Sequence, residues 1–167
     1  VEGSLTTSKS CGGIVGYAQF KKTSSTITIQ NCTNRVDVSA TAVRAGGVLG
    51  STYFTYAGTL RLENCKNEAN ITSSSKTAAG IVAELGTLPA NSTVILAGCE
   101  NRGTVSAAGA EAGGMIATAE AQKNLSTLRL EDCRNAALIE AKNTGGLLGS
   151  VNASNMTIAN CSNTAKI

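Results

Sequence analysis

Six cysteines are the residues of this chain most obviously suited to metal or redox chemistry. Five of them recur at spacings of 33, 34, 34 and 28 residues, each followed two places later by Asn: Cys32, Cys65, Cys99, Cys133 and Cys161. The chain has no His and no Cys-x-x-Cys pair, so we expect no zinc site. Two interpretations remain open. The thiols either form disulfides between neighbouring repeats or, as we favour, stay free and pack as small hydrophobic groups.

Carboxylates are the second set that could do chemistry. Polysaccharide hydrolysis or elimination needs carboxylates or a base gathered on one face. Asp is scarce, and Glu63 and Glu131 each lie two residues from an Arg, which favours solvated ion pairs. We therefore expect no catalytic residues and no cofactor; the alternative is a fragment of a β-helical polysaccharide lyase or hydrolase.

The aromatic residues form the third set, and all five lie close together in the sequence: Tyr17, Phe20, Tyr53, Phe54 and Tyr56. They fall in "YAQFKKTSS" and "STYFTYAGT", two of five variable stretches that we interpret as loops. Exposed aromatic rings stack on sugars or anchor protein partners. The same rings could instead cover an apolar flank of the fold. Both interpretations stay open, and these five residues are the candidate ligand-binding set.

The elements that must position these residues belong to an internal repeat. Each unit opens with a glycine signature: "CGGIVG", "AGGVLG", "AAGIVA", "AGGMIA" and "TGGLLG". The third and fifth residues before each repeated Cys are apolar in every unit. The chain is thus expected to be a single domain, 1–167, with repeats near 10–43, 44–76, 77–109, 110–141 and 142–167. A period of this length is typical of solenoids.

Within each unit the pattern predicts strands. Apolar residues alternate in "STITIQNC", "GTLRLENC" and "STLRLEDC", which is the period of a half-buried strand. We expect three strands per unit: a glycine strand near 12–18, a strand ending at Cys, and a strand such as "VDVSA". Five such units predict an all-β protein, a parallel β-helix of about five rungs that is right-handed like most strand crossovers. The paired glycines mark a tight corner.

Stacking in register would place equivalent residues of successive rungs side by side. The five Asn of the Cys-x-Asn steps would then form a ladder of hydrogen-bonded amides: Asn34, Asn67, Asn101, Asn135 and Asn163. One place after the Cys, the charged residues alternate in sign as Lys66, Glu100 and Arg134. Like charges on adjacent rungs would repel, so this alternation indicates the same register.

The glycine signatures, each followed by a Thr/Ser-rich strand, Asn-Cys-x-Asn and a V-x-V-type strand, resemble the GLUG-motif repeats of bacterial surface proteins and adhesins. Units three and four depart from the pattern by lacking the final Gly. The resemblance implies an extracellular β-helical region at a bacterial cell surface, used in adhesion or as a stalk, and it supplies no catalytic residues. The implied partners are glycans or host surface proteins.

Charge and composition limit the other partners. The net charge of +3 comes from 14 basic and 11 acidic residues that are scattered along the chain, so nucleic-acid binding is not expected. No apolar stretch is long enough to insert into a membrane, and residues 1–10 are polar. We expect a fragment of a longer exported protein, with the export signal and anchor outside it. The oligomeric state stays open.

Overall fold

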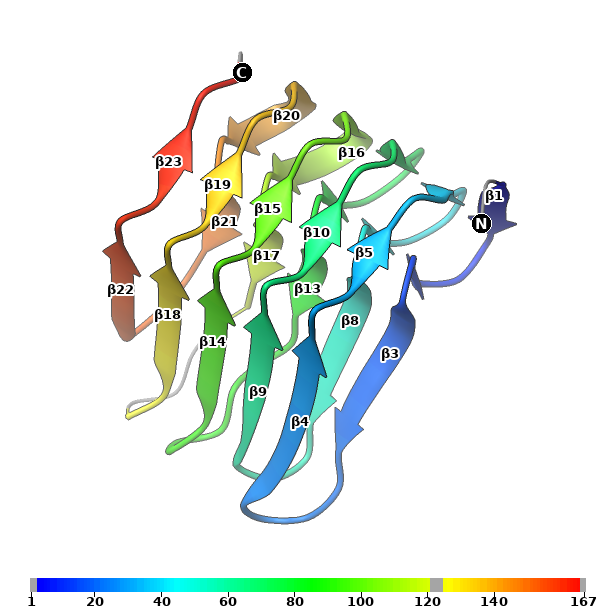
Figure 1. Ribbon diagram of the computed structural model, residues 1–167. Helices are drawn as coiled ribbons and strands as arrows, with labels where there is room; N and C mark the ends of the chain where they lie inside the picture. The colour runs from blue at the N-terminus through cyan, green and yellow to red at the C-terminus, as the bar shows by residue number, and fades with distance from the viewer. Residues whose placement is uncertain (1–2, 121–124, 166–167) are drawn as a thin grey trace.

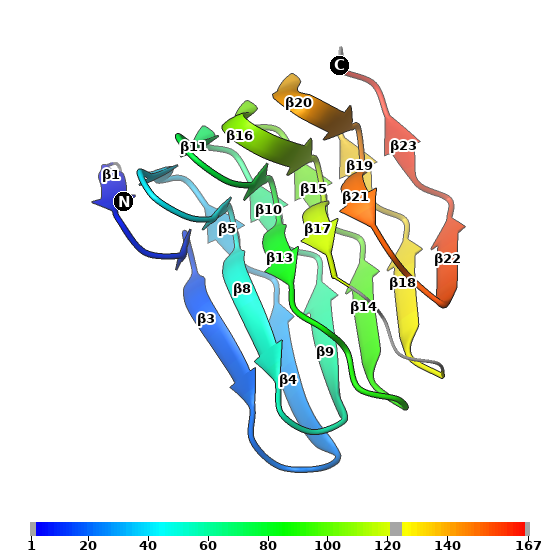
Figure 2. The same ribbon diagram turned by 180° about the vertical axis from the view of Figure 1, so that it is seen from behind.

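All regular structure in the computed structural model, which describes residues 3–120 and 125–165, is β-structure. The strands wind as parallel coils of a β-solenoid with about four turns (Figure 1), which confirms the predicted fold class. Followed from the N-terminus, the chain turns clockwise as it advances away from the observer, so the solenoid is right-handed (Figures 1 and 2).

The strands of the described residues form four parallel sheets, which we name A to D. Sheet A contains β1 (Ser4–Thr7), β6 (Asp37–Ala40), β11 (Ile71–Ser73), β16 (Val105–Gly113), β12 (Ala78–Ala79), β7 (Ala45–Gly46) and β2 (Cys11–Gly12), with β20 (Ile139–Gly145) paired to β16. Sheet B contains β3 (Val15–Phe20), β8 (Leu49–Phe54), β13 (Val82–Leu85), β17 (Ile116–Ala119) and β21 (Leu148–Val151). Sheet C contains β4 (Ser25–Gln30), β9 (Gly58–Glu63), β14 (Thr93–Ala97), β18 (Thr127–Glu131) and β22 (Asn155–Ala159). Sheet D contains β5 (Thr33–Asn34), β10 (Lys66–Asn67), β15 (Glu100–Asn101), β19 (Arg134–Asn135) and β23 (Ser162–Asn163).

Each coil passes through the sheets in the order B, C, D and A. Sheets C and D follow one another along the front of Figure 1, sheet B lies behind them, and sheet A closes the top. The register is the one expected from the repeat, because the Asn residues of sheet D pair from rung to rung. In sheet C, Ile95 lies between Arg61 and Arg129 and keeps these two like charges apart.

The coil has more and shorter strands than the three per unit that we predicted. The glycine strand is divided at the Gly pair, where sheet A passes into sheet B. A second break precedes each repeated Cys, where the backbone is left-handed, with φ between 53° and 62°, at Asn31, Asn64, Gly98, Asp132 and Asn160. Gly, Asn and Asp tolerate this conformation best, so the residue type at this position ends sheet C and begins sheet D.

The interior contains two hydrophobic clusters. The larger lies between sheets B and C and includes Leu49, Leu60 and Leu96; the smaller lies under sheet A and includes Val38 and Ile71. Between them, the side chains of the sheet D asparagines reach across to the glycines at the junction of sheets A and B. The core is therefore mainly aliphatic, with Phe20 and Phe54 as its aromatic members, and it is divided by one polar row.

Candidate functional site

The Asn row is a continuous hydrogen-bonded ladder. Each Nδ2 donates to the Oδ1 of the next Asn, at 2.8 Å from Asn34 to Asn67, Asn67 to Asn101 and Asn101 to Asn135, and at 2.7 Å from Asn135 to Asn163. Each Nδ2 also donates to the backbone carbonyl two residues further on, as from Asn101 to Gly103. Four of these amides are buried, those of Asn34, Asn67, Asn101 and Asn135, and they bond to one another, so the ladder has a structural role.

The Asn ladder explains one glycine of each signature. A side chain at Gly80 would overlap the carboxamide of Asn101 and the carbonyl oxygen of Gly114. The same clash with the facing Asn arises at the equivalent glycines Gly13, Gly47, Gly114 and Gly146. Unit three has Ala79 where the other units have the first glycine of the pair, but it keeps Gly80 as the second. The Cys-x-Asn step and the glycine signature are therefore two sides of one contact.

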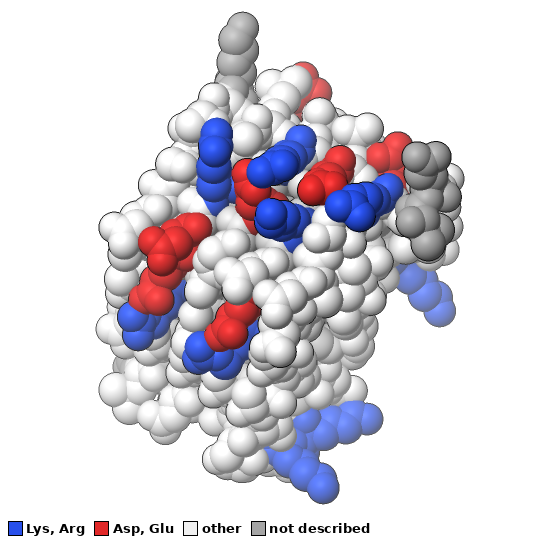
Figure 3. Space-filling model, in the orientation of Figure 1, with Lys and Arg blue, Asp and Glu red and all other residues white. Residues whose placement is uncertain are grey.

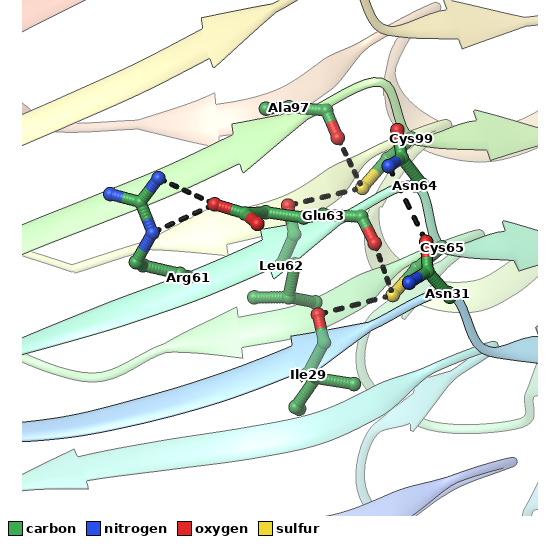
Figure 4. A network of polar contacts seen from close by, with 9 residues as sticks. All are labelled: Ile29, Asn31, Arg61, Leu62, Glu63, Asn64, Cys65, Ala97 and Cys99. Atoms are coloured by element: carbon green, nitrogen blue, oxygen red, sulfur yellow. Dashed lines mark hydrogen bonds and ion pairs between the residues drawn. The ribbon is translucent and has the colours of Figure 1, made fainter.

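The five repeated cysteines form a second ladder, which belongs to the larger hydrophobic cluster or packs against it, and all six cysteines of the chain are free thiols. The thiols of Cys65 and Cys99 donate across the rungs to the carbonyl oxygens of Ile29 and Leu62, each at 3.4 Å (Figure 4). Hydrogen bonding to the thiols of Cys133 and Cys65, with burial, raises the pKa of Cys99. A buried thiol with a raised pKa is a poor nucleophile, so Cys99 packs as a small hydrophobic group.

The outer face of sheets C and D carries charges of both signs next to one another (Figure 3). Arg35 pairs with Glu68 across two rungs at 2.8 Å, and Arg102 pairs with Glu100 within one rung at 2.9 Å. Arg61 and Arg129 pair with Glu63 and Glu131, as expected for solvated ion pairs. This face therefore presents a balanced charge pattern.

The structure divides the five aromatic residues into two groups. Phe20 and Phe54 stack at 4.1 Å between ring centroids and are 0% and 6% exposed, so both rings belong to the core. Tyr17, Tyr53 and Tyr56 are 54%, 53% and 50% exposed. The loop assignment was also wrong for four of the five, because β3 and β8 extend to Phe20 and Phe54 and only Tyr56 lies beyond them. Side chains alternate along these strands, so Tyr17 and Tyr53 face outward from sheet B.

Two adjoining hollows lie along the outer side of sheet B, with volumes of about 680 and 500 Å³. They share Arg44, Glu84, Thr87 and Glu120, and together we call them the sheet B groove. Tyr53 borders it at one end and Asn152 at the other. Thr118 pairs in register with both Glu84 and Ser150, so the groove crosses successive rungs.

The charges of the sheet B groove interact with one another. Arg44 forms an ion pair with Glu84, whose side chain is only 13% exposed. Burial raises the pKa of Glu84; Glu120 acts in the same direction, whereas Arg44 and Lys76 oppose the shift. Thr77 also lines the groove, and within the described residues its buried hydroxyl has no hydrogen-bond partner. These are polar groups of the kind that orient a ligand in a hollow.

The sequence did not reveal the sheet B groove. Glu84 and Glu120 lie in stretches that we interpreted as loops, and Arg44 precedes a glycine signature, so each occurs once and in a different rung. Residues 121–124, in the fourth of those stretches, lie outside the described residues. One pattern in the sequence could have indicated the groove. Leu85 and Ala119 are apolar and point inward, and because side chains alternate along a strand, the preceding residues Glu84 and Thr118 must point outward.

No protein-family model, curated protein or solved structure matches the chain. Over residues 3–120 and 125–165, no group of three or more Cys, Asp or Glu side chains is placed to hold a metal ion. The same part of the chain contains no helix that is long and apolar enough to cross a membrane.

Proposed function

We propose that this chain is a non-catalytic, adhesin-like repeat module that binds glycans or glycoproteins through the outer face of sheet B. The observation that carries the proposal is the exposure of Tyr53 beside the polar groove formed by Arg44, Glu84 and Glu120. An exposed ring supplies an apolar platform for the face of a sugar, and neighbouring charged and hydroxyl groups accept and donate hydrogen bonds to its hydroxyls.

The resemblance to GLUG-motif repeats supports an extracellular setting at a bacterial cell surface, with the module acting in a longer exported protein. Six free thiols do not oppose this setting, since five of them form the buried or half-buried column at the inner side of the coil. A solenoid whose rungs all stack also holds its binding face rigid.

The test is binding of the chain to a panel of glycans and mucin-type glycoproteins, with Tyr53→Ala and Tyr56→Ala as a matched pair. Both tyrosines are half exposed, but only Tyr53 borders the groove, so Tyr53→Ala should weaken binding roughly tenfold and Tyr56→Ala should not. Neither change should lower the melting temperature by more than a few degrees. A folded chain that binds nothing in the panel would instead indicate a stalk.

A second candidate is a polysaccharide hydrolase or lyase, favoured by the raised pKa of Glu84 close to Glu120 in an open groove. A carboxyl with a raised pKa is suited to act as a general acid, with a second carboxylate as its partner. The Arg44 ion pair opposes this role because it occupies Glu84. New reducing ends released from a bound polysaccharide by the wild type, and not by Glu84→Gln, would establish the enzyme and overturn the non-catalytic proposal.

A further inference from the structure

The direction of the sheet B groove limits the shape of its ligand. The groove is lined in turn by residues of four consecutive rungs: Tyr53, Glu84, Thr118 and Ser150 mark the second to the fifth. Adjacent strands of a sheet lie about 4.8 Å apart, so the first and last of these four rungs are roughly 14 Å apart along the solenoid axis. A pyranose unit is about as long as the spacing between two neighbouring rungs, so one unit can lie over each of the four rungs. A linear chain of sugars therefore fits the groove better than a single ring does.

The charges of the groove limit the chemistry of that chain. Glu84, Glu111 and Glu120 line it together with Arg44 and Lys76, and Arg44 is already paired with Glu84. The three carboxylates would repel a polyanionic glycan, and the two basic groups would repel a polycationic one. Like-charge contacts of this kind select against a partner. Neutral sugars, whose hydroxyls both donate and accept hydrogen bonds, meet no such repulsion.

A second observation, independent of the charges, points to a ligand. Thr77 lines the groove, its hydroxyl is buried beneath the groove surface, and no group in the described residues bonds to that hydroxyl. An unpaired buried hydroxyl costs free energy in the unliganded protein, and rotation of the Thr77 side chain toward the groove would let a sugar hydroxyl bond to it. From these three features we propose that the sheet B groove binds a neutral linear oligosaccharide of about four units along the solenoid axis. The proposal rests on the glycan-binding function and specifies its ligand.

The test is calorimetric titration with neutral oligosaccharides of glucose, mannose and N-acetylglucosamine, from disaccharide to hexasaccharide, beside polygalacturonate fragments of the same lengths. In the series that binds, affinity should rise at least tenfold from disaccharide to tetrasaccharide and then level off. Affinity that does not change with length, or tighter binding of the acidic fragments, would overturn the proposal.

Two variants locate the ligand, each with its own control. Ser150→Trp fills the far end of the groove and should reduce tetrasaccharide affinity to that of the disaccharide; Thr157→Trp lies exposed on β22 of the same rung, outside the groove, and should change nothing. Thr77→Val removes the unpaired hydroxyl and should weaken binding about fivefold with no loss of thermal stability. If Tyr53→Ala abolishes binding while Ser150→Trp and Thr77→Val have no effect, the glycan-binding function stands and the axial site is wrong. If no glycan binds the folded wild type, the proposed function itself fails.

Discussion

The Asn side chain of each rung performs three tasks at once: it bonds to the rung on either side, it closes its own backbone turn, and it contacts a glycine across the coil. The repeated spacing of Cys and Asn predicted the ladder, because in-register stacking must bring equivalent residues together. The contact with glycine could not be predicted, since it joins two motifs that lie about twenty residues apart in sequence and on opposite sides of the interior.

Replacing Asn101 with Ala should lower the free energy of unfolding by about 2–4 kcal/mol. It removes the hydrogen bonds to Asn67 and Asn135 and leaves their buried amide groups unsatisfied. Asn163 is exposed at the end of the same ladder, so Asn163→Ala should cost about 1 kcal/mol or less. Urea unfolding of both variants checks the difference, and equal losses would show that the ladder does not stabilise the interior.

Glu84→Gln should change how stability depends on pH. Burial raises the pKa of Glu84 above its ordinary value of 4.5, so the folded state favours the protonated form. The protonation of Glu84 therefore contributes to the stability of the folded state at low pH. This contribution is lost as the pH rises through the raised pKa. Urea unfolding at a series of pH values measures this effect. The free energy of unfolding of the wild type, relative to that of Glu84→Gln, should fall as the pH increases from about 4 upwards. A difference that is constant, or that grows in favour of the wild type, would contradict the burial of this carboxyl.

Strand boundaries follow from single positions that interrupt the alternation of side chains. The alternating residues before each Cys predicted sheet C, but the extent of sheet B was missed because the stretch after the glycines is different in every unit. In that stretch only the inward positions are constrained, and they hold residues as unlike as Phe20, Phe54 and Leu85. The outward positions are free to vary, and one of them, Glu84, became part of the sheet B groove.

The turn between sheets C and D should depend on its left-handed residue. Asp132 is exposed and has a φ of 53°, so Asp132→Val should lower the free energy of unfolding by about 1–2 kcal/mol, whereas Asp132→Gly should be close to neutral. Thermal unfolding of the two variants measures the contrast. Similar melting temperatures would mean that this turn relaxes to another conformation.

Stacked coils contact only their neighbours, so the molecule behaves as a one-dimensional array with two long faces of different character. The sheet C and D face is covered with balanced ion pairs, which the repeat predicted. The sheet B face carries the groove and two exposed tyrosines, and the repeat did not predict either feature. Features that recur in every rung can be predicted from a repeat, whereas a binding site made of residues that each occur once requires the structure.

Deleting residues 77–110 should give a shorter but folded solenoid. Ala45 and Ala112 both pair in register with Ala78, so they would pair with each other once one full coil is removed. The variant should keep a β-type circular dichroism spectrum and unfold cooperatively at a lower temperature. Deleting only 77–93 leaves half a coil and should prevent folding; a folded product would contradict the assigned register.

Ligand binding at the outer face of sheet B can be observed in the two-dimensional NMR spectrum of the chain with labelled tyrosine, recorded during titration with the tightest-binding oligosaccharide. The chain has three tyrosines, so each ring can be followed separately. We expect the signals of Tyr53 to shift most and those of Tyr56, which lies outside the sheet B groove, to stay in place. Shifts confined to Tyr56, or no shift of any ring under saturating ligand, would show that the outer face of sheet B is not the binding surface.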